Sequence, residues 1–138
     1  MKKLILSTFA LLLVLSCSDE PAPFEAYPQT HDIRFTIEAS DKRGSEIDLD
    51  IEGDNLDISW RSSSNDNLPL DISYPNTTVA YLTIATINYR DLSEVQVGVP
   101  FEPYTIKMTI RVDDEIVESK EVTINESGQV DFVNYSFQ

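Results

Sequence analysis

The chain has 138 residues, with 24 acidic residues against 10 lysines and arginines, and its formal net charge is −14 at pH 7. This charge argues against nucleic acid as a partner, because lysine and arginine side chains supply the attraction to phosphate backbones. There is one cysteine, so no disulfide can form within the chain, and the core has to be held by burial of apolar side chains.

The first predicted element is a short apolar segment at the N-terminus. Lys2 and Lys3 precede residues 4–15, which are apolar apart from one serine and one threonine. A membrane-spanning helix needs about twenty apolar residues, so this segment is too short to be one. A basic start followed by a short apolar stretch is typical of a secretory signal peptide, which we place at residues 1–16.

The single cysteine comes directly after this segment. Val14, Leu15 and Ser16 lead into Cys17. This arrangement resembles the lipobox of bacterial lipoproteins, in which a small residue precedes a cysteine that is acylated and becomes the mature N-terminus. The resemblance implies that Cys17 is lipidated and that the lipid anchors the protein to the outer membrane, on its periplasmic or its surface side. Two or three acyl chains give firm attachment, at about 0.8 kcal/mol per buried methylene group.

The next segment reads as a spacer. Residues 18–30 are rich in proline and show no strand-like alternation, so we interpret residues 17–30 as the lipidated cysteine and a flexible tether. Residues 31–138 remain as one domain, which is long enough to bury a core.

Alternation of apolar and polar residues dominates from residue 31 onward, as in strands with one face buried and one face in water. No window has the apolar spacing of three and four residues that a helix requires. The predicted strands lie at 33–37, 47–51, 56–60, 68–74, 79–89, 95–99, 104–112, 116–124 and 129–137.

The breaks between these segments suggest how the strands are arranged. Short polar turns predict that the first three strands form a meander. Pro69 and Pro75 place the strand at 68–74 at a sheet edge, because proline donates no hydrogen bond to a neighbouring strand. Residues 79–89 are apolar or β-branched on both faces, which indicates a central strand.

Short strands at intervals of about ten residues, without a helix, are typical of an antiparallel β-sandwich or a small barrel. We favour an immunoglobulin-like β-sandwich of about seven to nine strands. Phe35, Trp60 and Tyr81 are the aromatic residues expected in its core.

One segment of the domain resembles a known family. Residues 104–122, YTIKMTIRVDDEIVESKEV, are similar to the strand, acidic turn and strand near the end of MmpS-type transport accessory domains. The resemblance covers about a quarter of the domain. It implies a β-sandwich and, as an alternative role, an accessory subunit.

The sequence offers little for catalysis. A nucleophilic triad needs a base, and the one histidine, His31, stands at the junction of tether and domain. The carboxylates of "EIDLDIEGD" are expected side by side on a solvent face, where they aid solubility. We therefore expect no enzyme activity and no cofactor.

Oxygen-rich turns are the candidates for a metal site, because calcium prefers carboxylate and carbonyl ligands. No EF-hand spacing is present, and the same residues are ordinary turn formers. The candidate calcium ligands are Asp54, Asn55 and Asp57, then Asp66 with its flanking Asn65 and Asn67, and finally Asp113, Asp114 and Glu115.

Together these features predict a lipid-anchored β-sandwich lipoprotein of the cell envelope with a non-catalytic binding or structural role. Two alternatives remain open. One is an accessory or inhibitor subunit that docks on a membrane or secreted protein. The other is a surface module that binds calcium, or a glycan through aromatic side chains.

Overall fold

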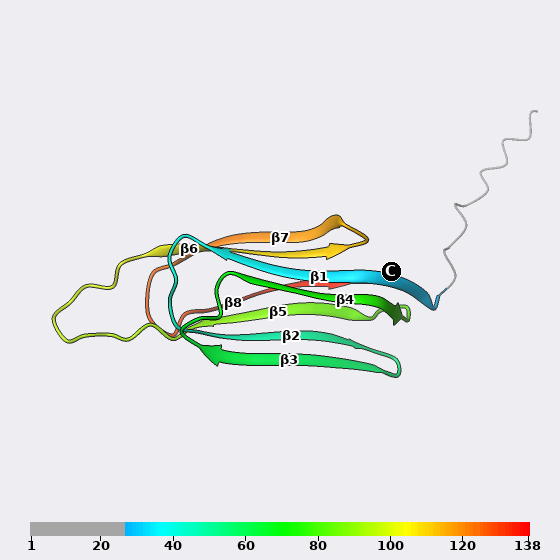
Figure 1. The fold of residues 1–138 in the computed structure, drawn as a ribbon, viewed down its shortest axis with the longest axis horizontal. Coiled ribbons are helices and arrows are strands. Elements are labelled where there is room, and N and C mark those ends of the chain that lie inside the picture. The colour runs from blue at the N-terminus through cyan, green and yellow to red at the C-terminus, as the bar shows by residue number, and fades with distance from the viewer. Residues whose placement is uncertain (1–26) are drawn as a thin grey trace, which may run out of the picture.

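A computed structural model describes residues 27–138, so Cys17, the signal peptide and most of the expected tether lie outside the described residues. The described chain is all-β, with eight antiparallel strands and no helix (Figure 1). The strands are β1 (Gln29–Ala39), β2 (Ser45–Gly53), β3 (Leu56–Ser64), β4 (Leu70–Val79), β5 (Ile84–Asp91), β6 (Tyr104–Val112), β7 (Glu115–Ile124) and β8 (Val130–Ser136).

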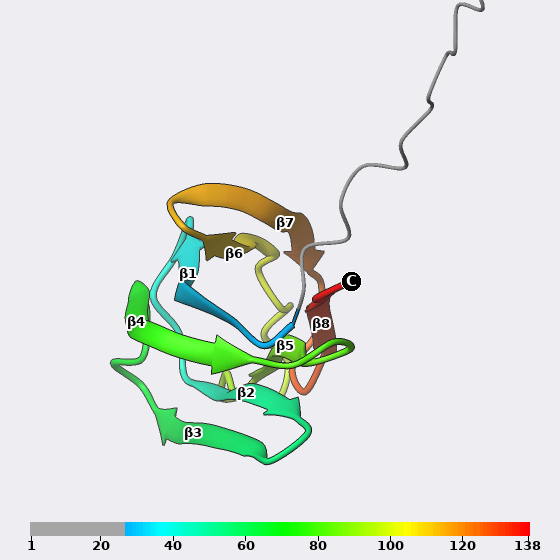
Figure 2. The same ribbon diagram turned by 90° about the vertical axis from the view of Figure 1, so that its right-hand side faces the viewer.

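The strands form a β-sandwich of two four-stranded sheets. Sheet A has the order β4-β1-β6-β7, and sheet B has the order β3-β2-β5-β8. The view along the strands in Figure 2 shows the two layers, with β7 close to β8 at one side and with β3 below β4 at the other. The predicted fold class is confirmed, and the strand number lies within the expected range.

Strand adjacency reproduces much of the immunoglobulin pattern. In that fold, strands B and E are neighbours in one sheet, and strands C, F and G are neighbours in the other. Here β1 lies beside β4, and β2, β5 and β8 lie side by side. In an immunoglobulin domain, the first strand, A, lies next to strand B. Here β1 corresponds to strand B, and β6 takes the position of strand A.

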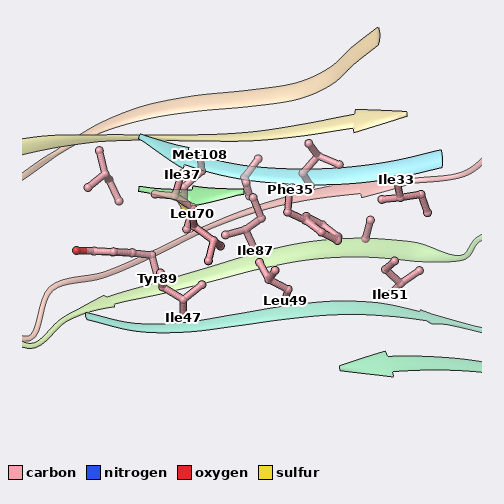
Figure 3. Close-up of a cluster of buried hydrophobic side chains, with 14 of the residues drawn as sticks. Ile33, Phe35, Ile37, Ile47, Leu49, Ile51, Leu70, Ile87, Tyr89 and Met108 are labelled. Atoms are coloured by element: carbon pink, nitrogen blue, oxygen red, sulfur yellow. The ribbon is translucent and has the colours of Figure 1, made fainter. Parts of the chain in front are cut away.

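The core lies between the sheets and follows the alternation in the sequence. Ile33, Phe35 and Ile37 of β1 are fully buried, and so are Ile47 and Leu49 of β2. Figure 3 shows these side chains pointing into the space between the two layers. At roughly 25 cal/mol per Å² of buried apolar area, this single apolar layer can stabilise the domain without a disulfide.

Several sequence expectations are confirmed at the level of single strands. β4 lies at the edge of sheet A, as the prolines predicted. β6 and β7 form the hairpin expected from residues 104–124. Asp113 and Asp114 both have positive φ, 50° and 68°, which are the backbone signs of a type I′ turn and explain how a two-residue turn forms without glycine. The acids of β2 face solvent.

The expected meander is wrong. β2 and β3 form a hairpin, but β1 pairs with β4 and β6 in the other sheet. Residues 79–89 are not one strand either, because a turn at Ala80–Thr83 separates β4 from β5. This turn contains neither glycine nor proline, and Leu82 adopts the required left-handed conformation at φ 63°.

Two further expectations are corrected. Residues 95–99 form no strand, because no neighbouring strand pairs with them, and they lie in the long β5–β6 connection. Tyr81 is 60% exposed and is not a core residue, whereas Trp60 is half-buried and Phe35 fully buried.

The folded domain starts within the segment expected to be a tether. β1 begins at Gln29, and the ring of Tyr27 packs edge-on against Tyr81 with 5.9 Å between centroids. The Tyr27 hydroxyl donates a hydrogen bond to the main-chain oxygen of Gln138 at 3.2 Å. Residues 27–30 are therefore part of the domain.

The sandwich has two distinct ends. The start of β1, the end of β8 and the turns β2–β3, β4–β5 and β6–β7 lie at one end, which we call the N-terminal end (Figure 1). The remaining connections lie at the opposite end, which we call the distal end. Among them is the connection between β5 and β6, residues 92–103, which we call the distal loop.

Candidate binding surface at the distal loop

The distal loop extends beyond the rest of the sandwich, on the side opposite the start of β1 (Figure 1). Three of its valines point into solvent: Val95 is 67% exposed, Val97 105% and Val99 57%. The tip is a tight turn, in which the Val99 N–H donates to the Gln96 carbonyl at 3.1 Å and Gly98 has φ 82°. Exposed apolar side chains grouped on one projection make this loop a candidate site of contact with another molecule.

The base of this loop is held by a buried polar network. Asp91, the last residue of β5, is fully buried, and its Oδ1 accepts a hydrogen bond from the Tyr104 hydroxyl at 2.5 Å. The same oxygen accepts the Ser93 hydroxyl at 2.6 Å, and Oδ2 accepts the Ser93 N–H at 3.0 Å. The Tyr104 hydroxyl also lies 2.7 Å from that of Tyr89. Both ends of the loop are therefore joined to one buried carboxylate.

Burial keeps the two tyrosine hydroxyls of this network protonated. It raises the pKa of the Tyr104 hydroxyl far above its ordinary value, and the hydrogen bond to Asp91 raises it further. Burial raises the pKa of Tyr89 as well. Both phenols therefore keep their protons at neutral pH, and Tyr104 remains a hydrogen-bond donor to the carboxylate.

Two more contacts hold the lower part of the loop. The guanidinium of Arg43 lies 5.2 Å from the ring centre of Phe101 and 5.0 Å from that of Tyr104. On the other side, the Ser127 hydroxyl donates to the Ser93 carbonyl at 2.6 Å. These contacts pre-organise the loop, which lowers the entropy lost on binding.

A hollow of about 310 Å³ lies along the loop. Its wall combines the side of Arg43 with apolar residues of the loop and with two carboxylates, Glu94 and Glu102. The surface therefore offers apolar contact beside negative charge, with one cation at its edge.

The candidate calcium ligands are separated by the fold. Asp54, Asn55 and Asp57 lie around the β2–β3 turn at the N-terminal end, whereas Asp66 lies in the β3–β4 connection at the distal end. Asp113 and Asp114 form the β6–β7 turn. Within residues 27–138, no group of three or more histidine, cysteine, aspartate and glutamate residues is arranged to hold a metal ion.

The first carboxylate of the β6–β7 turn has structural partners. Asp113 Oδ1 accepts the Asp32 N–H at 2.9 Å, and its Oδ2 lies 2.7 Å from Nδ1 of His31. Both hydrogen bonds lower the pKa of Asp113, and the one with His31 has the larger effect. The other ring nitrogen of His31 lies 2.9 Å from Gln29 Oε1, and the ring stacks on Phe137. His31 thus joins the start of β1 to the β6–β7 turn.

The aromatic side chains that could stack on a sugar do not share one surface. Tyr89 and Tyr104 are buried in the network below the distal loop, whereas Tyr81 is exposed in the turn between β4 and β5. Trp60 and Tyr74 are half-buried on the edge strands β3 and β4.

Sequence reasoning missed the role of Asp91. The available signal was its position in the alternation, because Ala85, Ile87 and Tyr89 precede it on the buried face of β5. An acid in such a series has to find hydrogen-bond donors inside the protein. The partners come from residues 93 and 104, which only the fold brings together.

Comparison with known proteins gives no relative. No family model matches the chain, and neither the curated proteins nor the solved structures contain a significant match. Residues 27–138 also contain no helix of the length and apolar character needed to cross a bilayer.

Proposed function

We propose that this protein is a lipid-anchored, non-catalytic binding module of the bacterial cell envelope that contacts a partner through the distal loop. Acylated Cys17 would hold it at the outer membrane. The lipobox-like sequence before Cys17 supports the anchor, and the positions of the two ends of the sandwich support the contact surface. A domain tethered at its N-terminal end presents the distal loop to its surroundings.

The observation that carries the proposal is the exposure of Val95, Val97 and Val99 on a loop with a fixed base. Valine on a solvent-exposed projection contributes nothing to the core, but it gains about 25 cal/mol per Å² when a partner covers it. Because the buried Asp91 network already orders the base of the loop, less conformational freedom is lost on binding.

The charge of the protein narrows the class of partner. Glu94 and Glu102 flank the apolar residues, and the whole chain carries a charge of −14. A partner with an apolar pocket and a neutral or basic rim fits this surface best. A membrane or secreted protein that this domain serves as an accessory subunit is such a partner.

The test of the contact surface is site-specific crosslinking in the cells that produce the protein. A photo-crosslinking amino acid at position 97 should trap one protein, and the same group at position 107, on the solvent face of β6, should not. The adduct should disappear when Val95→Asp and Val99→Asp are added. Equal trapping at both positions, or trapping that survives the aspartates, would contradict the proposal.

The test of the anchor is the Cys17→Ser variant. Loss of the acyl chains should release the protein from the membrane fraction, because several buried acyl chains give an attachment that one contact surface does not replace. A Cys17→Ser protein that remains membrane-bound after a high-salt wash would rule out lipid anchoring at this residue.

A further inference from the structure

The free edges of the two sheets differ in how they are protected. A sheet edge presents unpaired N–H and C=O groups, and natural proteins guard such edges with charges, prolines, bulges or covering elements. At one side of the sandwich, Lys120 of β7 forms an ion pair with Asp131 of β8 at 2.5 Å, which joins the two edges. β4 carries Pro75, and its pairing with β1 shifts register between His31 and Ile33.

β3 has neither a proline nor a bulge, and among the described residues no ion pair joins it to the edge of the other sheet. Its nine residues pair with β2 in one unbroken register, from Ser45 with Ser64 to Gly53 with Leu56. Its charged residues are Asp57 and Arg61. Every second residue of an antiparallel edge strand directs its N–H and C=O away from its neighbour. β3 is therefore a regular edge that can accept one more strand.

A groove runs beside this edge at the N-terminal end. It has a volume of about 590 Å³ and lies between the half-buried Leu56 and Ile58 of β3 and the half-buried Tyr74 of β4, with Pro75 and Val79 further along its wall. In Figure 2 the two edge strands are seen from this end, with β3 below β4. A strand added to β3 would direct alternate side chains into this groove.

The other side chains of such a strand would lie beside the outer face of β3, where Asp57 supplies negative charge at the N-terminal end. On the outer face of the sheet, the nearest residues to such a strand are Asp57, Ser59, Arg61 and Ser63 of β3, and one strand further in lie Glu52, Asp50, Asp48 and Glu46 of β2. Asp48 is paired with Arg61 at 2.5 Å and Glu46 with Arg90 at 3.7 Å. Among the described residues, Asp50 and Glu52 form no ion pair. Basic side chains therefore fit at the N-terminal end of β3, beside Asp57 and with Asp50 and Glu52 within reach across β3.

We propose that the β3 edge binds an extended peptide segment of a partner protein by strand addition. The segment has apolar residues at alternate positions, which enter the groove, and lysine or arginine between them, which lie beside Asp57 of β3 and reach towards Asp50 and Glu52 of β2. Main-chain hydrogen bonds to β3 fix the peptide, and the groove selects its side chains. This site is separate from the distal loop, and the proposal does not depend on the function proposed above.

A second copy of the chain is a poorer occupant. Two molecules that each carry −14 repel one another, and the acidic row of β2 would face another acidic protein. If the protein self-associates in dilute solution and Ile58→Lys abolishes the association, the peptide assignment is overturned in favour of a second copy.

The probe is a synthetic peptide of about nine residues, the length of β3, in which lysine alternates with valine and isoleucine. Binding to the folded domain should move the amide NMR signals of β3 and protect them from hydrogen exchange. The matched control replaces every lysine with glutamate and should bind at least about tenfold more weakly. Signals that move elsewhere, or equal binding of both peptides, would overturn the proposal.

N-methylated peptides test strand addition without any change to the protein. In an extended peptide, the N–H groups of alternate residues point to opposite edges. A peptide N-methylated at every apolar residue and a peptide N-methylated at every lysine should therefore differ in affinity. One of the two should lose binding, and the other should retain it. Loss of binding with both sets, or with neither, would exclude a strand paired along one edge.

Protein variants locate the site. Ile58→Lys places a charge in the groove and should weaken binding by about tenfold or more. Ile116→Lys is the matched control, because Ile116 is an exposed isoleucine on the opposite edge strand β7. Val97→Asp, which disables the distal loop, should leave peptide binding unchanged. If Ile58→Lys unfolds the domain, the N-methylated peptides still decide the question.

Discussion

The Tyr104 hydroxyl donates a hydrogen bond to Asp91 Oδ1 at 2.5 Å and so joins the first residue of β6 to the last residue of β5. Both side chains are buried, and the twelve residues of the distal loop lie between them in the chain. The distal loop therefore projects from a closed base, and the stability of that base can be measured.

Tyr104→Phe removes the hydroxyl and leaves a buried carboxylate with fewer donors. We expect a loss of about 1–3 kcal/mol in the free energy of unfolding, because an undersatisfied buried charge keeps its desolvation cost. Urea unfolding followed by circular dichroism measures it. Tyr81→Phe is the control, since Tyr81 is 60% exposed, and it should change little. Equal stability of the two variants would contradict the structural role of the bond.

The sequence predicts that residues 95–99 form a strand, whereas the structure places them in an exposed loop. The two descriptions differ in how much Val97 should contribute to stability, compared with a core residue such as Ile87. Val97 is fully exposed, so Val97→Ser should change the free energy of unfolding by no more than about 0.5 kcal/mol. Ile87→Ala opens a cavity in the core and should cost about 2–5 kcal/mol. Thermal and urea unfolding check both. A large loss for Val97→Ser would mean that the loop packs on the domain.

The hydrogen bond between Asp113 and His31 predicts a pH effect. The pKa of Asp113 is lowered in the folded state, so the folded protein binds fewer protons there than the unfolded chain does. Its contribution to stability is present above the unfolded pKa of about 4 and is lost as pH falls through the folded pKa. Because Asp113 is 55% exposed, the effect should stay below about 1 kcal/mol.

Asp113→Asn tests this directly. Asparagine tolerates the positive φ of the position and can still accept the Asp32 N–H, so the turn should be kept while the charge is lost. We expect the variant to be less stable than the wild type at neutral pH, with the difference vanishing at low pH. Urea unfolding at several pH values below 6 provides the measurement. A constant difference at all pH values would assign the effect to the turn.

The close approach of Gly53 to Thr83 predicts a steric coupling between the β2–β3 and β4–β5 turns at the N-terminal end. A Cβ atom at this position would lie 2.2 Å from Thr83 Oγ1 and 2.9 Å from its Cβ. Gly53→Ala should therefore destabilise the domain by about 1–3 kcal/mol. A double-mutant cycle with Thr83→Ala should show that part of this loss is recovered. Additive effects of the two substitutions would exclude the contact as its cause.

Alternation in the sequence predicts most strands because it reports which side chains face the core. Ile33, Phe35 and Ile37 occupy the buried face of β1 as their spacing requires. Alternation carries no information about the neighbouring strand. Val95, Val97 and Val99 alternate equally well, yet the fold places no strand beside them. Short-range sequence patterns also do not predict that β1 pairs with β4 and β6.

Turns were predicted where glycine, asparagine or aspartate marks them, and missed where an ordinary residue takes an unusual conformation. Leu82 at φ 63° ends the apolar run of 79–89 without any compositional signal. The candidate binding surface was missed for a related reason. Its base depends on Asp91 meeting Ser93 and Tyr104, and the last of these lies thirteen residues away in the chain.

The interleaved strand order delays completion of both sheets during folding. β1 needs β4 and β6 as neighbours, while β2 needs β5, so no early segment of the chain can finish a sheet by itself. Contacts between segments distant in sequence require the entropy of long loops to be lost before apolar burial compensates, which makes folding slow. The nascent domain thus has to remain soluble while incomplete, and its dense negative charge provides the repulsion that keeps partly folded chains apart.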